Sequence, residues 1–503
     1  MGLELEELLK KLQTLLDGDP EKAINEALKI NGDIRFQFLK AAILIDAGAI
    51  VKDKSSVTLG VEIYQDAVNK YPDNAELKYN LANGFHALAI STEYIDFSWY
   101  QETHEYRKKA RNLFYCSAGD VSSPPDIKSQ SFTNLGNVHW SSYRWVEAYD
   151  FYMLALNNDK CNGVASSGAL KILRYALSQE IGCPDLLCQE IEYLAAHVVS
   201  NKESIASYAG RNAVDSILNE IVSIPKKKRS SEINHRNDFV EFVIQNNLTL
   251  SPTIHSFIHE SDRWDDLNIV SVTTDVDSGS NIPEIFSMFN LIKSDYILAR
   301  QLFFNAINKS YIDTGTYSDT LDYACYGVNE SALSLAQRVS LDILDKVAVA
   351  SLFYLGIGGA RTTSFKQAWF KVKDKTKKLS PKILAEIQLG NTALLALSEV
   401  SNDLAEIEGY LVDKQQARNS STHRFTVLHD MGTLPESASR CIEHYDYEDF
   451  SVKVLSTLKL ARCAIIYFVQ MILLRENRLS DNRDGLAMPM TVPSHEHIRG
   501  LDE

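Results

Sequence analysis

Apolar residues recur every three or four positions through most of the second half of the chain, which is the spacing of one face of a helix. Four stretches carry this pattern: residues 283–307, 329–355, 380–416 and 447–474. The third stretch begins well, because Ser380 is a good N-cap residue and the next residue is proline. Gly390 is expected to interrupt it. Four long helices joined by loops predict a helical bundle.

The first half repeats a pattern of small and aromatic residues with a period of 34 residues. The first copy, residues 41–74, contains Ala47, Gly48, Gly60, Tyr64, Ala67 and Pro72. Small residues let two antiparallel helices approach closely, the aromatic residue fills the space between them, and the proline ends the second helix. The pattern recurs from Ala75, where an insert around residues 91–102 delays the second helix, and again from Ser129.

This pattern resembles the tetratricopeptide (TPR) repeat. The resemblance implies an array of paired helices whose concave surface holds a peptide or a partner protein. A scaffold that only packs against the rest of the chain is the alternative. The sequence therefore predicts an all-α protein, with a TPR-like array over residues 1–224, a connecting segment over 225–282, a helical bundle over 283–480 and a tail over 481–503.

Composition excludes several classes of protein. Of the 503 residues, 45% are hydrophobic and 23% are charged, which argues against a disordered chain. The balance of 51 basic against 66 acidic residues gives a net charge of −15, so the chain as a whole is not built to coat nucleic acid. The odd number of cysteines, 7, fits a reducing compartment. The start of the chain lacks a signal-peptide pattern and the longest apolar run, residues 464–474, is short for a membrane span, so we expect a cytoplasmic protein without membrane contact.

One segment departs from the acidic average. Between Arg361 and Lys382 eight basic residues face one acid, and three aromatic residues lie among them. Lysine and arginine side chains with interleaved aromatic rings are typical of nucleic-acid binding, although a solvated basic loop remains the alternative. The candidate RNA-binding residues of this segment are Arg361, Lys366, Lys371, Lys373, Lys375, Lys377 and Lys378.

The most informative motif is Arg-Asn-Ser-Ser-Thr-His, which runs from Arg418 to His423. On a helix, Asn419 and His423 would share a face, and the long Arg418 side chain could reach the same place. A neutral imidazole can take a proton near pH 7, a guanidinium can hold a phosphate oxygen, and an amide can orient either group. Lys414 and Arg424 flank the motif and are expected to assist phosphate binding.

The motif and its helical surroundings resemble the HEPN (higher eukaryotes and prokaryotes nucleotide-binding) family of ribonuclease domains, over roughly residues 283–477. The resemblance implies a metal-independent endoribonuclease without a cofactor, in which Arg418 and His423 are catalytic and Asn419 orients them. It also implies a homodimer whose two motifs line one cleft. Members of the family commonly cut tRNA, mRNA or ribosomal RNA in toxin–antitoxin and antiviral systems.

Two alternatives to this function remain at this point. A catalytically inert domain that binds nucleotides or protein partners would share the same helical pattern. A metal site formed by His423, His429 and Asp430 is conceivable, but the spacing matches no known set of ligands, so no metal is expected.

Overall fold

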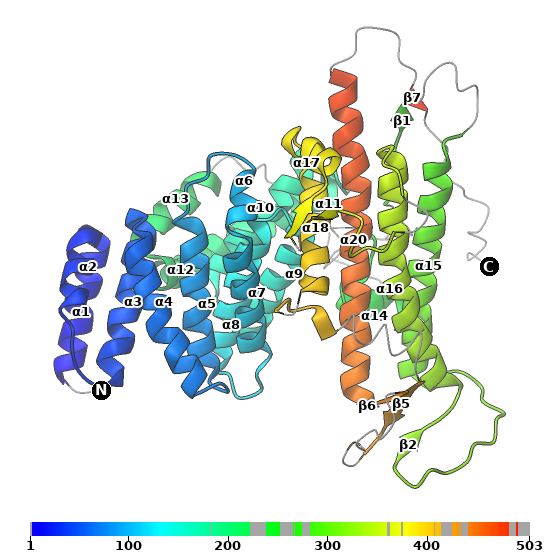
Figure 1. The fold of residues 1–503 in the computed structure, drawn as a ribbon, viewed down its shortest axis with the longest axis horizontal. Helices are drawn as coiled ribbons and strands as arrows, with labels where there is room; N and C mark the ends of the chain where they lie inside the picture. Colours follow the sequence, from blue (N-terminus) through cyan, green and yellow to red (C-terminus); the bar gives the residue numbers. More distant parts are fainter. Residues whose placement is uncertain are drawn as a thin grey trace. The chain divides into compact units, whose positions relative to one another are not determined.

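The computed structural model describes residues 3–182, 184–221, 238–251, 265, 267–273, 282–359, 363–373, 376–406, 408–413, 425–431, 434, 441–481 and 489–490. The chain is all-α, as predicted, with a few short strands (Figure 1). It divides into two compact units. The first contains Met1–Arg229 together with Ala405–Val412, and the second contains Ser230–Leu404 together with Asp413–Glu503.

The described part of the first unit is a succession of helices, most of which pack against the helix that follows. Its helices are α1 (Leu3–Gly18), α2 (Pro20–Leu28), α3 (Ile34–Val51), α4 (Lys54–Lys70), α5 (Ala75–Ile90), α6 (Ser98–Glu102), α7 (His104–Gly119), α8 (Pro125–Trp140), α9 (Trp145–Asn158), α10 (Gly163–Ser178), α11 (Pro184–Ser200), α12 (Lys202–Ala209) and α13 (Arg211–Ile221). The pairs α3/α4, α5/α7 and α8/α9 coincide with the three repeats expected from the sequence, and α10/α11 forms a further pair. The last five residues of the insert in the second repeat form α6.

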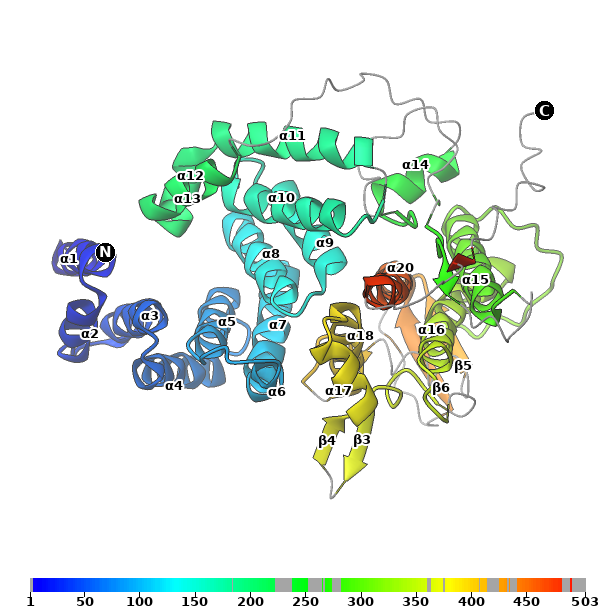
Figure 2. The same cartoon turned by 90° about the horizontal axis from the view of Figure 1, so that it is seen from above.

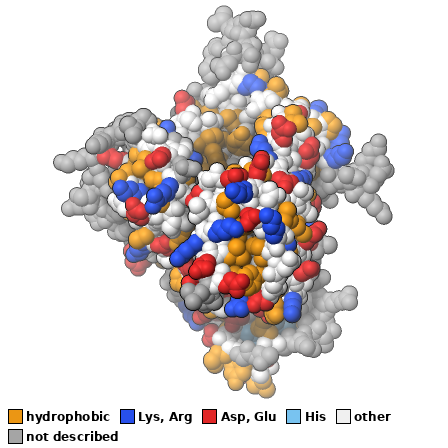
Figure 3. All heavy atoms as spheres, turned by 90° about the vertical axis from the view of Figure 1, so that its left-hand side faces the viewer, with side chains coloured by type: hydrophobic (Ala, Val, Ile, Leu, Met, Phe, Trp, Pro, Cys, Tyr) orange, Lys and Arg blue, Asp and Glu red, His pale blue; other side chains and the backbone are white. Residues whose placement is uncertain are grey.

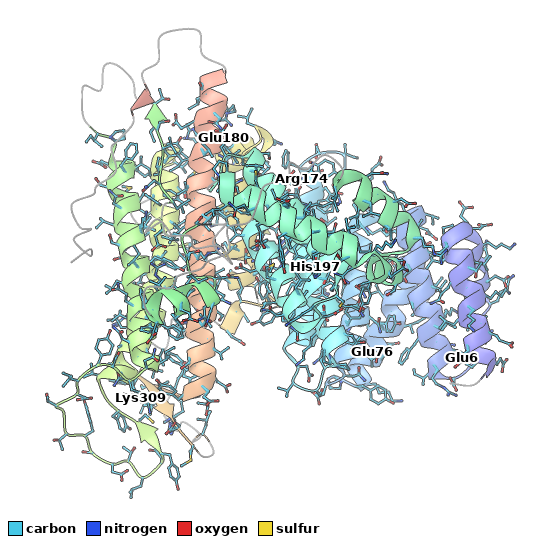
Figure 4. All side chains as sticks on the ribbon, turned by 180° about the vertical axis from the view of Figure 1, so that it is seen from behind. Glu6, Glu76, Arg174, Glu180, His197 and Lys309 are labelled. Carbon is cyan, nitrogen blue, oxygen red and sulfur yellow. The ribbon has the colours of Figure 1, made fainter. Side chains whose placement is uncertain are left out.

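Polar residues placed before these helices explain where several of them begin. The side chains of Asp33, Asp53, Asn74 and Asn162 each accept a hydrogen bond from a backbone N–H in the first turn of the helix that follows. These bonds satisfy amides that have no partner within the helix. Figure 4 marks His197 on α11, where the imidazole Nδ1 lies 2.7 Å from the Ser166 hydroxyl of α10 and joins that pair of helices.

Surface charges on the first unit are mixed. Figure 3 looks from the side of the N-terminal helices and shows Lys and Arg side chains interspersed with Asp and Glu. Such a surface is typical of solvated helices.

Glycines at the repeat positions allow the helices to approach closely. A Cβ atom added to Gly60 would lie 2.7 Å from Ile45 Cγ1 and 2.8 Å from the carbonyl oxygen of Ala41. At Gly136 the added atom would lie 2.7 Å from the ring of Tyr152. The small residues singled out in the sequence are therefore small because another helix occupies the space of a side chain.

We expect Gly60→Ala to lower the free energy of unfolding by about 1–3 kcal/mol, because the methyl group meets a backbone oxygen that cannot move away easily. Gly119→Ala is the matched control, since a Cβ atom there meets nothing within 4 Å at the end of α7. That variant should be neutral or stabilising by about 0.5–1 kcal/mol. Thermal unfolding of the two variants checks the prediction, and equal midpoints would contradict it.

The described part of the second unit contains long helices and three small sheets. The helices are α14 (Asp238–Gln245), α15 (Glu284–Ile307), α16 (Val328–Tyr354), α17 (Pro381–Gln388), α18 (Thr392–Ala405, whose last residue belongs to the first unit) and α20 (Tyr447–Asp481). The strands are β1 (Val272–Thr273), β2 (Ala324–Cys325), β3 (Phe370–Lys373), β4 (Thr376–Leu379), β5 (Phe425–His429), β6 (Ile442–Asp446) and β7 (Pro489–Met490). β1 pairs with β7 and β3 with β4, both antiparallel, whereas β5 lies antiparallel to β2 and parallel to β6.

Helix α20 is the centre of this unit. It packs against α15 and α16, and Figures 1 and 2 place α18 beside it. By length and composition it is apolar enough to cross a membrane, but 83% of its apolar window is buried inside the structure. Packing against neighbouring helices therefore accounts for its apolar character.

Buried arginines tie the segment after α14 to two of the long helices. Arg300 of α15 donates to the carbonyl oxygen of Leu248 at 2.8 Å and pairs with Asp265. Arg462 of α20 donates from Nε to the carbonyl oxygen of Thr249 at 2.7 Å, and from its guanidinium to that of Ser251 at 3.3 Å. The described parts of 225–282, expected to be only a connecting segment, are thus packed into the second unit.

The third helical stretch also differs from the expectation. It divides into α17 and α18, because Gly390 adopts a left-handed backbone conformation with φ +96° that ends α17. Helix α18 ends at Ala405 rather than near residue 416, and residues 405–412 pack with the first unit. Residues 425–429, just after the predicted catalytic motif, form a strand.

We expect Arg462→Met to lower the free energy of unfolding of the second unit by about 1–3 kcal/mol, since two buried carbonyl groups would lose their donor. Arg338→Met is the control, because Arg338 is exposed on α16 and its loss should change stability by no more than about 0.5 kcal/mol. Circular dichroism on heating measures both. A midpoint for Arg462→Met at or above that of the control would show that the two carbonyl groups do not need this donor.

Candidate nucleic-acid interface

The predicted catalytic motif lies at a gap between described segments. Lys414, Arg418, Asn419, His423 and Arg424 fall outside the described residues, which end at Asp413 and resume at Phe425. The two flanks are nevertheless placed. Val412 belongs to the first unit, and Phe425 is the first residue of β5 in the second unit.

Two histidines, His429 and His444, connect the strands β5 and β6 that follow the motif. His429 at the end of β5 is buried, and its Nδ1 lies 2.9 Å from the carbonyl oxygen of Asp322. Its Nε2 lies 2.8 Å from Nδ1 of His444 on β6. A neutral His429 that donates from Nδ1 accepts at Nε2, so this pair needs no extra proton. Both nitrogens of His429 are engaged, which leaves neither open for the metal site considered from the sequence.

A pocket of about 290 Å³ opens where β5 starts. It lies between the sheet and the first three turns of α16, and it is lined by Cys325, Tyr326, Gly327, Glu330, Ser331, Ser334, Leu335, Arg338, Phe425, Thr426 and Leu428. The motif is therefore adjacent in sequence to a wall of this pocket, because His423 precedes Phe425 by two residues.

Arg338 gives the pocket a cation. Its guanidinium is exposed and forms no hydrogen bond or ion pair with the part of the chain that the structure describes. Ser334 and Glu330 stand one and two helical turns before it, respectively, on the same face of α16. An exposed guanidinium beside hydroxyl groups can bind a phosphate oxygen.

Two aromatic residues, Tyr326 and Phe425, line the pocket, and a third, Tyr323, lies two residues before Cys325 of its wall. The Phe425 side chain is 72% exposed, which is unusual for phenylalanine, and Tyr323 is 65% exposed. Tyr326 lines the pocket and stacks on Tyr317 with 6.5 Å between the ring centroids. Exposed rings next to a cation are typical of surfaces that stack nucleobases.

Two aspartates, Asp313 and Asp322, lie in the loop between α15 and α16 and accept hydrogen bonds from that loop and from the start of α16. Asp313 accepts hydrogen bonds from the backbone N–H groups of Gly315 and Val328, each at 2.8 Å, and so caps α16. These two bonds lower the pKa of the Asp313 carboxyl, so that it remains ionised at neutral pH. For Asp322 the largest effect is the hydrogen bond from the Thr320 hydroxyl, which also lowers the pKa.

The basic segment forms a second candidate surface. Lys371 and Lys378 lie directly opposite each other on the β3–β4 hairpin, and both are exposed. Lys371 and Lys382 line a pocket of about 470 Å³, which also contains Gly358 and Ser380. Like charges opposite each other destabilise a hairpin unless an anion lies between them. This arrangement favours an anion such as phosphate.

The remaining basic residues of this segment are distributed as follows. Lys366 is half-buried, and its carbonyl oxygen accepts a hydrogen bond from Ser401. The side chains of Lys373 and Lys377, and Arg361 and Lys375 as a whole, lie outside the described residues. The lysine pocket contacts α16 at Leu352, which is 14 residues or about 21 Å along the helix from Arg338. The described structure thus does not bring the hairpin to the pocket at β5.

Sequence reasoning missed Arg338, Tyr326 and Phe425. One signal was present in the sequence, because Glu330, Ser334 and Arg338 stand four residues apart and so share one face of the predicted helix. The other two residues could not be found, since no local pattern marks a loop and a strand as neighbours.

The comparison with known proteins supports the C-terminal domain. Residues 276–475 match the family described as LA2681-like HEPN. This segment contains α15, α16, α17, α18 and nearly all of α20, and in sequence it includes Arg418 and His423. The predicted HEPN domain is therefore confirmed for this part of the chain, whereas residues 1–224 lie outside the match. No curated protein matches the chain.

Proposed function

We propose that the protein is a metal-independent endoribonuclease of the HEPN type. The observation that carries the proposal is the Arg418-to-His423 motif inside a segment that matches a HEPN family. The pocket at β5 adds an exposed cation, Arg338, and an exposed ring, Phe425, two residues after His423. Two residues of extended chain span about 7 Å at most, so the two features are close enough to act on one nucleotide.

The chemistry follows from the residue types. His423 takes the proton of the ribose 2′-OH, and the 2′ oxygen attacks the adjacent phosphorus. The bond from phosphorus to the 5′ oxygen breaks, and this oxygen takes up a proton as it leaves. Arg418 stabilises the added negative charge, and Asn419 orients the reacting groups. The products are a 2′,3′-cyclic phosphate and a 5′-hydroxyl.

Further elements of the proposal concern the setting of the enzyme. The protein acts as a homodimer in which both motifs line one cleft, with Lys414 and Arg424 assisting at the phosphate. The TPR-like array senses a partner. The activity serves a toxin-like or antiviral role in the cytoplasm, with tRNA, mRNA or ribosomal RNA as its target.

Cleavage of RNA in excess EDTA tests the activity. We expect the full-length protein to cut, and His423→Ala and Arg418→Ala to lose at least about 100-fold in rate, because each removes a group used in the transition state. End analysis should show cyclic phosphate. A protein without activity on any RNA tested would indicate the alternative, an inert HEPN module. Variants that cut as fast as wild type would contradict the catalytic roles of His423 and Arg418.

The pocket has its own test. Phe425→Ala should weaken binding of single-stranded RNA by about 1–3 kcal/mol, the usual contribution of one stacked base. Arg338→Ala should also weaken it. Tyr71→Ala is the matched control, because Tyr71 is an exposed aromatic residue of the first unit, 47% exposed. Equal affinities for all three proteins would remove the pocket from the RNA-binding surface.

The basic hairpin is tested by salt. If RNA phosphates lie on it, the Lys371→Ala/Lys378→Ala double variant should reduce the slope of log K against log salt by about 2. A Lys10→Ala/Lys22→Ala variant changes the charge equally on exposed residues of the first unit. A slope that both variants share with wild type would support the alternative, a solvated loop.

A further inference from the structure

The first unit holds a short piece of chain that comes from the middle of the second. Residues 405–412 lie between α18 and the catalytic motif in sequence, and residues on both sides of them belong to the second unit. Two of their side chains, Glu406 and Tyr410, are bound by α7, α8 and α9. We call this surface of α7–α9 the Tyr410 site.

Tyr410 is held by hydrogen bonds and ring contacts. Its hydroxyl lies 3.0 Å from Nε2 of His139, accepts a hydrogen bond from Arg144 at 3.0 Å, and lies 3.2 Å from a carboxylate oxygen of Glu147. Its ring centroid lies 5.1 Å from that of Tyr115. His139 and Arg144 are fully buried, and Arg144 also binds Glu147. The site therefore recognises a phenol specifically.

Glu406 is the second anchor. One carboxylate oxygen lies 2.7 Å from Nζ of Lys108 and 3.1 Å from Nε2 of His104. Burial alone would raise the pKa of this carboxyl, but the hydrogen bonds from His104 and Lys108 outweigh it and lower the pKa to about 2. Glu105 completes the cluster, and Lys108 binds both carboxylates, which makes the cluster an ion-pair network rather than a cation site.

The rest of the segment contributes little specificity. Glu408, between the two anchors, is exposed, and Leu411 after them is buried. The segment thus binds as a short peptide does, through a carboxylate, a tyrosine four positions later and one apolar residue. Such contacts can be made equally well by a segment of another protein.

We propose that the Tyr410 site is a peptide-binding site which the chain's own 405–412 segment occupies at rest, and that a partner protein with a Glu-x-x-x-Tyr-apolar segment competes for it. A tethered segment acts at an effective concentration on the order of millimolar, so it occupies the site until a tighter ligand arrives. Displacement would release the chain that leads into Arg418 and His423, and this consequence rests on the proposed ribonuclease activity.

The test uses a fluorescent peptide with the sequence of residues 402–413 and the full-length protein. Wild type should bind it at least about 10-fold more weakly than Tyr410→Ala, whose own segment no longer competes. Tyr410→Phe keeps the ring contacts and should give an intermediate affinity, which guards against a folding defect in Tyr410→Ala. Equal peptide affinity for wild type and both variants would overturn the proposal.

Peptide variants test the recognition. Replacing the tyrosine by phenylalanine, or the glutamate at position 406 by alanine, should weaken binding to Tyr410→Ala protein about 10-fold or more, because each removes hydrogen bonds to charged groups. Replacing the glutamate at position 408 by alanine should leave binding unchanged. Indifference to the first two replacements would show that the site has no such chemistry.

The same proteins show whether the Tyr410 site is occupied by the segment of a second copy of the chain. If wild type is a dimer that the peptide dissociates, the occupant is the segment of a second copy, and a partner protein is not needed.

RNA cleavage by Tyr410→Ala should differ from wild type at least threefold, while Glu408→Ala should match wild type. Equal cleavage by active proteins would contradict the release of the motif. Absence of cleavage in all of them would contradict only the ribonuclease activity, since peptide binding is measured separately.

Discussion

The burial of α20 is the constraint on which the second unit depends. From Cys463 to Ile472 every residue of this helix is buried, whichever way its side chain points. A helix that is apolar all round must be covered on every side, so α15, α16 and α18 have to surround it. The long helices predicted from the sequence consequently pack around one shared core and are not separate amphipathic helices.

A fully covered helix leaves polar groups that need partners inside the unit. Arg462 meets the carbonyl oxygens of residues 249 and 251. Glu476 accepts from the backbone N–H of Thr273 at 3.0 Å and from the Tyr354 hydroxyl at 2.6 Å. The backbone of Met471 accepts from the side chain of Asn391. Since an unpaired buried polar group costs free energy, these contacts determine where the surrounding loops lie.

Buried polar groups of the first unit also need partners, and residues 405–412 supply some of them. Arg144, His139 and Lys108 are buried, and much of their hydrogen bonding is completed by Tyr410 and Glu406. The segment is therefore part of the first unit although the chain on either side of it is not. Along the chain, this segment of the first unit is followed six residues later by Arg418, the start of the motif.

Periodicity, capping residues and small residues are local, and they were sufficient to predict the long helices of the second unit, the helix pairs of the first and the close approach at Gly60. The HEPN domain was also predictable, because its motif is a short stretch of sequence. Tertiary structure alone decided that residues 405–412 leave their domain, that residues 425–429 form a strand, and that Arg338 and Phe425 share a pocket. Each of these depends on partners distant in sequence, such as Tyr410 with Arg144 or His429 with His444, and only packing brings such partners together.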